Sequence, residues 1–248
     1  MGSLRKILFL FLLLSLTAFT FSKDVVRIIY HGHACFSILT PKKLSIMIDP
    51  FSKKLGYKFP RIPAHIVLIS HEHYDHNNYK DVVGYPIILH GLKENGNFNK
   101  IDFYLQDVHI FNLPSYHDKK NGDLRGLNSI FVIDIENFRI IHMGSFGAFF
   151  EKKELDELYK PNVLMIPVGG FFTIDANEAY ALCKKIKPSV IMPMHFKTEF
   201  TKDLPFDGIE KFLKLFPENK IFNPKKRVVK FNLDKDYGKG VVYLMKYK

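Results

Sequence analysis

Short apolar runs rich in β-branched residues recur along the chain, and each ends at Pro, Gly, a polar residue or a charged residue. Runs of about four to eight residues with this composition are typical of buried or half-buried strands. Strands therefore dominate the first half of the chain. The segments that we predict as strands are residues 25–30, 35–40, 44–48, 66–69, 86–89, 108–113, 130–135, 138–141, 163–168, 190–194, 227–232 and 241–244.

Helical segments enter mainly in the second half, where they alternate with strands. We predict helices over residues 151–159, 176–186 and 208–216, and a further short helix near Asp75. Pro188 terminates the second of these, and the Asp75 side chain is suited to cap the last. Strands followed by strand–helix alternation, loosely repeated in two halves, fit two sheets packed face to face with helices outside. The fold class is α/β (α+β).

The polar segment His-Glu-His-Tyr-Asp-His at residues 71–76 directly follows the apolar run 66–69 and Ser70. Imidazole and carboxylate groups are common ligands of zinc and iron. In an extended segment His71 and His73 point to one side and can reach one ion. Asp75 and His76 begin the next turn and can reach a second point nearby. The segment therefore predicts a metal site at the end of a strand.

Several other motifs follow predicted strands, and with residues 71–76 they resemble landmarks of one family. The motifs are GHACF at 32–36, IDPF at 48–51, SYHD at 115–118, IPVGG at 166–170 and MPMHF at 192–196. HxHxDH after an apolar strand, in this context, resembles the metallo-β-lactamase fold superfamily over residues 25–198. The branch holds metal-dependent hydrolases related to enzymes acting on phosphodiesters and lactones. The resemblance implies a four-layer αββα sandwich with metals at one edge between the sheets.

The resemblance also implies two ligand sets. The first metal would be held by His71, His73 and His117, and the second by Asp75, His76 and His195. We expect one or two zinc ions, with iron or manganese as alternatives.

The family pattern breaks at Ser145. His142-Met143-Gly144-Ser145 stands where this branch usually reads H-x-G-D, with the Asp bridging two metals. A neutral hydroxyl is a weaker ligand than a carboxylate, so either one metal suffices or a second site persists without the bridge. The third subclass of metallo-β-lactamases resembles this arrangement. We expect a site able to take two metals, with weaker occupancy of the second.

Other polar residues have more than one reading. Asp49 either accepts a hydrogen bond from a ligand imidazole or forms a turn before Pro50. His33 is expected to line the pocket, and His142 either orients a ligand or fills space. Thr173 and Asp175 either shape the pocket or cap the helix at Ala176. A separate group, His65, His90 and His109, is expected to be structural.

These observations predict a metal-dependent hydrolase in which an activated water attacks an ester, phosphodiester or lactone/lactam-type substrate. Asp75 would act in catalysis by orienting the water and moving its proton. Two alternatives stay open. One is a phosphodiesterase or nuclease, and the other is a non-catalytic metal-binding member of the family.

The N-terminus differs from the rest of the 248-residue chain. Arg5 and Lys6 precede an almost continuous apolar stretch over residues 7–21, followed by small residues before Lys23. This predicts a signal peptide over residues 1–22 and one hydrolase domain over 23–248. The protein would be exported, periplasmic or secreted, without a stable membrane span after cleavage. Membrane anchoring by an uncleaved N-terminus is the alternative.

Charge and cysteine content refine the choice of partner. The formal net charge is +11, and the excess lysines are spread along the sequence. This indicates a basic surface with some preference for anionic partners, and nucleic acid is a weakly supported alternative to the small-molecule substrate that we expect. Cys35 and Cys183 lie in apolar settings without metal-ligand spacing, so we expect two buried thiols.

Overall fold

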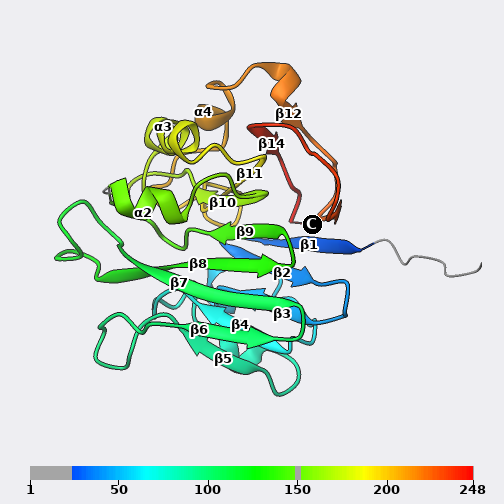
Figure 1. The fold of residues 1–248 in the computed structure, drawn as a ribbon. Helices are drawn as coiled ribbons and strands as arrows, with labels where there is room; N and C mark the ends of the chain where they lie inside the picture. Colours follow the sequence, from blue (N-terminus) through cyan, green and yellow to red (C-terminus); the bar gives the residue numbers. More distant parts are fainter. Residues whose placement is uncertain (1–23, 149–151, 248) are drawn as a thin grey trace, which may run out of the picture.

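The computed structural model describes residues 24–148 and 152–247, in which two sheets pack face to face (Figure 1). The predicted signal peptide lies outside the described residues. The six-stranded sheet runs, in spatial order, β13 (Val228–Asn232), β1 (Val25–Gly32), β2 (Cys35–Leu39), β3 (Ser45–Ile48), β4 (Ile66–Ile69) and β5 (Ile87–His90). The eight-stranded sheet runs β12 (Ile221–Phe222), β14 (Val241–Tyr243), β11 (Val190–Met194), β10 (Val163–Pro167), β9 (Phe138–His142), β8 (Leu127–Ile135), β7 (Val108–Tyr116) and β6 (Asp102–Leu105).

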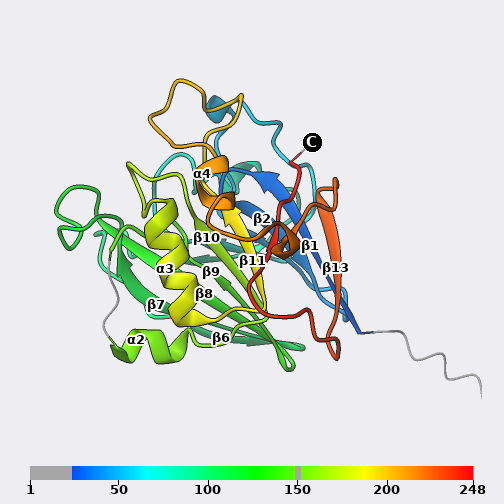
Figure 2. The same cartoon turned by 90° about the horizontal axis from the view of Figure 1, so that it is seen from above.

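The helices α2 (Lys152–Glu157), α3 (Ala176–Ile186) and α4 (Glu210–Leu213) lie on the outer face of the eight-stranded sheet (Figure 2). The outer face of the six-stranded sheet is covered differently in the described ranges. A loop rich in aromatic residues packs there, together with the short 3-10 helices η1 (Lys53–Leu55) and η2 (Tyr79–Asp81). In the described ranges, no helix has both the length and the apolar character needed to cross a membrane.

The main core fills the space between the sheets, and side-chain alternation explains it. In β3 and β4, Ile46 and Leu68 face the other sheet, whereas Met47 and Val67 join the aromatic cluster on the outer face. Both faces of these strands are therefore buried, which is why their sequences read as continuous apolar runs. β3, β4 and β5 pair in parallel, so their carboxyl ends reach the same edge of the sheet.

Most predicted elements are present, but prolines and polar turns changed some boundaries. β7 continues through Pro114 to Tyr116, because β6 pairs with it only as far as Phe111 and the missing N–H is not needed beyond that point. The sequence analysis missed the short strands β6 and β12.

One predicted helix is absent and two are shorter than expected, α2 ending at Glu157 instead of residue 159. Residues 74–76 form a turn closed by the His76 N–H donating to the His73 carbonyl at 2.9 Å, so the prediction of a helix near Asp75 is wrong. α4 spans only Glu210–Leu213 of the predicted 208–216, and the backbone continues beyond it with shorter-range turn bonds such as Phe216 N–H to Leu213.

Candidate metal centre

Histidines from four separate segments meet at one edge of the sandwich. The turn after β1 supplies His33, the loop after β4 supplies His71, His73 and His76, and the ends of β7 and β11 supply His117 and His195. All of these segments leave the carboxyl end of a strand. The rigid sheets therefore fix where each side chain begins, and the loops carry the polar chemistry.

The first cluster consists of His71, His73 and His117, each offering a nitrogen within 4.8 Å of the others. The Ser70 hydroxyl donates its proton to Asp49, so its oxygen can only accept from His71. His71 Nδ1 therefore donates to Ser70 Oγ at 2.9 Å. His117 donates from Nδ1 to the Phe172 carbonyl at 2.9 Å. These bonds fix the tautomers and leave Nε2 of both rings with a free lone pair.

Whether these residues fit a metal can be tested best at His71 Nε2. It is a buried nitrogen without any hydrogen-bond partner. Buried polar atoms are normally paired, so an unpaired one needs a specific explanation. The neighbouring rings of His73 and His117 lie 4.6 and 4.8 Å from the His71 ring, between centroids. A divalent ion placed among the three nitrogens would satisfy His71 Nε2, so the residues present fit a metal.

The electrostatic environment keeps these imidazoles neutral. Burial, and then the charges of His76 and His117, hold the pKa of His71 well below its usual value. Burial and the neighbouring His73 lower the pKa of His117 to about 4. Metals bind the neutral ring, so protons do not compete with an ion here at neutral pH.

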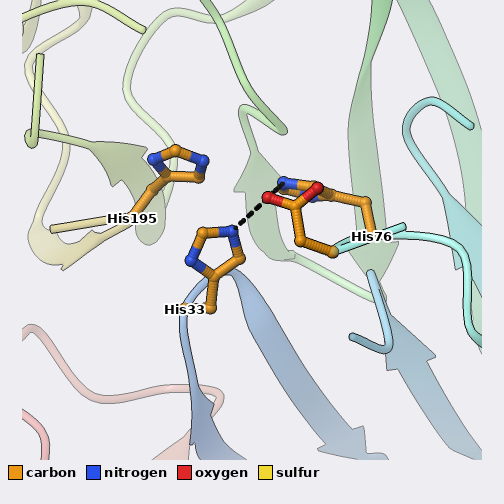
Figure 3. A group of neighbouring side chains, drawn as sticks. His33, His76 and His195 are labelled. Atoms are coloured by element: carbon orange, nitrogen blue, oxygen red, sulfur yellow. Dashed lines mark hydrogen bonds and ion pairs between the residues drawn. The ribbon is translucent and has the colours of Figure 1, made fainter. Parts of the chain in front are cut away.

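The second cluster contains His33 as well as the three residues that the resemblance implied. His33, Asp75, His76 and His195 have candidate ligand atoms within 4.8 Å of one another. Figure 3 shows the imidazoles of His33, His76 and His195 grouped around a common space. His33 Nε2 lies 2.9 Å from Asp75 Oδ2. The backbone N–H of His195 donates to the backbone carbonyl of His33 at 2.9 Å. His33 therefore belongs to the cluster, whereas the sequence analysis expected it to line the pocket, whose lining does not include it.

Asp75 is ionised in this setting. Burial by itself would raise the pKa of Asp75, but the charge of His76 and the hydrogen bond from His33 outweigh it, so the pKa lies well below its usual value. The same carboxylate lies 3.6 Å from His76 Nε2. It can serve as an anionic ligand or as a proton acceptor, but it does not cap a helix.

Asp49 connects the two clusters through hydrogen bonds with Ser70 and His76. It is fully buried in the left-handed region, at φ 47°, and it accepts from the Ser70 N–H at 2.8 Å and from Ser70 Oγ at 2.7 Å. It also accepts from His76 Nδ1 at 2.9 Å. Burial alone would raise the pKa of Asp49, but His76 and Ser70 lower it further than burial raises it. Asp49 thus makes the hydrogen bond to an imidazole that the sequence analysis considered, and it turns His76 Nε2 toward the second cluster.

Ser145 and His142 have different roles at this edge. Ser145 is fully buried, and its Oγ lies 3.1 Å from His76 Nε2, so its hydroxyl borders the second cluster. His142 donates from Nε2 to the Ala34 carbonyl at 2.8 Å and accepts the Gly144 N–H at Nδ1 over 3.1 Å. With both nitrogens engaged, His142 links β9 to the turn after β1 and touches no ligand imidazole through a hydrogen bond.

The remaining polar candidates have structural positions. Asp175 caps α3 and forms a capping box with Glu178, which agrees with the helix-capping role considered for Asp175. Thr173 donates its hydroxyl proton to the Ile174 carbonyl. Gly169 lets the backbone around His195 approach closely, because a Cβ on Gly169 would lie 2.2 Å from the His195 carbonyl oxygen.

A separate group of histidines lies outside both clusters. His65, His90 and His109 pair with Ser45, Glu72 and Asp102. Cys35 and Cys183 are buried and not bridged.

A pocket of about 420 Å³ opens onto both clusters. Four of its lining residues, Arg125, Phe172, Leu204 and Phe206, were missed by the sequence analysis. Arg125 stands at the end of the charged turn that follows His117, which was the only signal in the sequence for it. Leu204 and Phe206 lie beyond β11 and carried no signal. The full lining is Glu72, His73, Tyr74, Asp75, His117, Arg125, Phe172, His195, Leu204 and Phe206.

Comparison with known proteins identifies the class to which this fold and site belong. Residues 27–195 match the family model of the beta-lactamase superfamily domain. The match covers more than half of the chain, and the chain belongs to this superfamily. A metallo-β-lactamase superfamily protein of known structure from Thermotoga maritima is 25% identical, with a TM-score of 0.71 over 89% of this chain and 98% of that one.

Curated relatives narrow the class further. A metal-dependent hydrolase of Thermoplasma acidophilum is 29% identical over 70% of this chain and 84% of its own length. Another metal-dependent hydrolase, of Polynucleobacter asymbioticus, is 31% identical over 69% of this chain and 74% of its own length. These similarities place the chain among the metal-dependent hydrolases of the metallo-β-lactamase superfamily.

Proposed function

We propose that the protein is a zinc hydrolase that cleaves an ester, phosphodiester or lactone/lactam-type bond with an activated water. The unpaired Nε2 of His71, within reach of His73 and His117, is the observation that carries this proposal. Three neutral imidazoles suit zinc, with iron or manganese as alternatives. Asp75, His76 and His195 would hold a second ion.

The chain's own residues prepare the reaction. A bound divalent ion would supply a water of lowered pKa and polarise the substrate oxygen. Asp75 is held ionised, so it can orient that water and accept its proton. His33 donates from Nε2 to Asp75 and keeps the carboxylate turned into the cluster. Phe172 and Phe206 wall the pocket with apolar surface, which limits the access of bulk water to the reacting bond.

Metal analysis combined with a substrate panel tests this function. Purified protein should contain one to two equivalents of divalent metal. Dialysis against EDTA should abolish turnover, and zinc should restore it. The panel would contain 4-nitrophenyl acetate, bis(4-nitrophenyl) phosphate, a chromogenic cephalosporin and a simple lactone. Metal-free protein whose turnover is indifferent to EDTA would refute the proposal.

Phosphodiester hydrolysis is the second candidate, favoured by the net charge of +11 and by Arg125 in the pocket. Salt-sensitive turnover of the phosphodiester, or of RNA, without turnover of the lactam would select it. Metal binding without turnover of any substrate would instead select the non-catalytic alternative.

Replacing Ser145 with Asp is expected to strengthen the second metal site. The new carboxylate would stand beside His76 Nε2 and add the negative charge that two dications need. We expect the second equivalent to bind on the order of 10–100-fold more tightly. The metal-free variant should melt below wild type, because it buries a third carboxylate around His76, which Asp49 and Asp75 already contact. Ser145→Asn is the neutral control. Titration calorimetry showing equal second-site affinity in S145D and S145N would contradict this account.

A further inference from the structure

Arg125 stands in the pocket without an acidic partner. It lines the same cavity as His73, His117 and Asp75, and it is half-buried. Among the described residues, no carboxylate forms an ion pair or hydrogen bond with its guanidinium. A guanidinium presents several N–H donors in a planar fork that matches a carboxylate or phosphate group. The pocket therefore contains an unused donor group suited to an oxyanion.

An aromatic platform fixes the guanidinium and connects it to the first cluster. The Arg125 guanidinium carbon lies 5.1 Å from the Phe172 ring centroid and 5.9 Å from that of Phe171. The carbonyl of the same Phe172 accepts from His117 Nδ1 at 2.9 Å. One residue thus orients a candidate metal ligand through its backbone and supports the cation through its ring.

The turn that carries Arg125 is rigidly held by a buried carboxylate. Asp118 accepts the Arg125 N–H at 2.8 Å and the Lys120 N–H at 2.8 Å, together with those of Gly122 and Leu124. Burial alone would raise the pKa of Asp118, but these backbone donors lower it, so the carboxylate stays ionised. The turn is therefore ordered before any substrate arrives, so substrate binding carries little entropic cost for ordering it.

The acids near Arg125 are already engaged elsewhere. Glu72 pairs with His90 at 2.7 Å, and Asp75 is bonded to His33. In the adjoining cavity, which shares His117, Arg125 and Phe172 with the first, Glu178 pairs with Lys119 and caps α3 with Asp175. Lys120 also lines this second cavity. The cleft therefore continues past Arg125 into a cavity where carboxylates and basic side chains are mixed, and the guanidinium of Arg125 is the group at the junction that suits an anion.

We propose that Arg125 binds an oxyanion group of the substrate, a carboxylate or phosphate, beside the bond that is hydrolysed. This inference rests on the proposed hydrolase function and narrows its substrate class to anionic molecules. The anion sits between the first metal cluster and the cleft toward Lys120, and the apolar part of the substrate packs on Phe172 and Phe206.

Anion binding without turnover provides the test. Zinc-loaded wild type, Arg125→Gln and Arg125→Lys would be titrated calorimetrically with inorganic phosphate and, separately, with succinate. A charge-assisted hydrogen bond lost in Arg125→Gln should weaken the preferred anion about 10- to 100-fold. Arg125→Lys keeps the charge but not the planar fork, so its affinity should be intermediate. Arg61→Gln removes an exposed arginine outside the pocket and should bind like wild type.

The readouts separate this proposal from the proposed function. Metal content is measured on every variant, and unchanged zinc in Arg125→Gln shows that the clusters are intact. A greater loss for phosphate or for succinate identifies which oxyanion the site prefers, and either result supports the proposal. Equal affinities of wild type and Arg125→Gln for both anions, or no binding of either anion to wild type, would overturn it. Metal-free wild-type protein would refute the hydrolase proposal itself, whatever the anion result.

Discussion

Replacing His71 with Ala is expected to abolish tight metal binding and hydrolysis together, with activity falling at least about 100-fold. His71 belongs to the first cluster and borders the second, because its ring lies 4.6 Å from that of His73 and 4.2 Å from that of His76, between centroids. The variant removes one of three ligands of the first ion and opens a gap beside the second cluster. Plasma mass spectrometry of the purified variant and turnover of the best panel substrate would measure both losses.

Thermal unfolding separates loss of metal from loss of fold in His71→Ala. Zinc should raise the melting temperature of wild type, since an ion that binds only the folded state stabilises it. The metal-free variant should melt below metal-free wild type, because it loses the bond from His71 Nδ1 to Ser70 Oγ and leaves a cavity where a buried ring stood. It should show no zinc-induced rise. His65→Ala, an exposed histidine paired with Ser45, is the matched control. Full metal content in His71→Ala would show that the first ligand set is wrong.

Replacing Asp49 with Ala is expected to have the largest effect on stability, about 3–5 kcal/mol, because it breaks a buried charged network. The substitution leaves the Ser70 N–H, the Ser70 hydroxyl and His76 Nδ1 without their acceptor. His76 would lose its orientation, so the second ion should bind about 10- to 100-fold more weakly. Urea unfolding of metal-free protein and zinc titration would measure the two effects.

Asp49→Asn keeps the shape and supplies a pH test. Folding lowers the pKa of Asp49, so its ionisation stabilises the fold above the unfolded value of about 4, and this contribution is lost as pH falls further. The stability difference between wild type and Asp49→Asn should therefore shrink in acid. Asp234→Asn changes an exposed carboxylate and serves as the control. A difference that stays constant from neutral pH down to acid would argue against the ionised network.

The local pattern of apolar and polar residues was sufficient to predict most of the strands and the position of the polar segment 71–76. The apolar runs 66–69 and 190–194 became β4 and β11 with unchanged boundaries, because each is a short buried strand closed by a polar residue. The spacing of residues 71–76 placed His71 and His73 in one cluster and Asp75 and His76 in the other. The expected partners His117 and His195 are near them in space, although only family resemblance assigned each to a cluster.

Local pattern failed where distant segments compete for one side chain. Asp75 was expected to cap a helix, but its carboxylate bonds to His33, 42 residues earlier in the chain. The segment around it forms a turn instead. Pro114 was expected to end a strand, but the edge position of that part of β7 removes the penalty for its missing N–H.

The sequence by itself determined most of the strands and the polar segment 71–76, because strand periodicity and ligand spacing are properties of neighbouring residues, and its resemblance to the superfamily implied the fold and the partners His117 and His195. Only the tertiary structure decided which polar atoms remain unpaired, how Asp49 and Phe172 orient the imidazoles, and that Arg125 enters the pocket. These facts depend on contacts such as the one between His117 and Phe172, 55 residues apart. Such contacts arise from the packing of the two sheets and their loops, which no local pattern encodes.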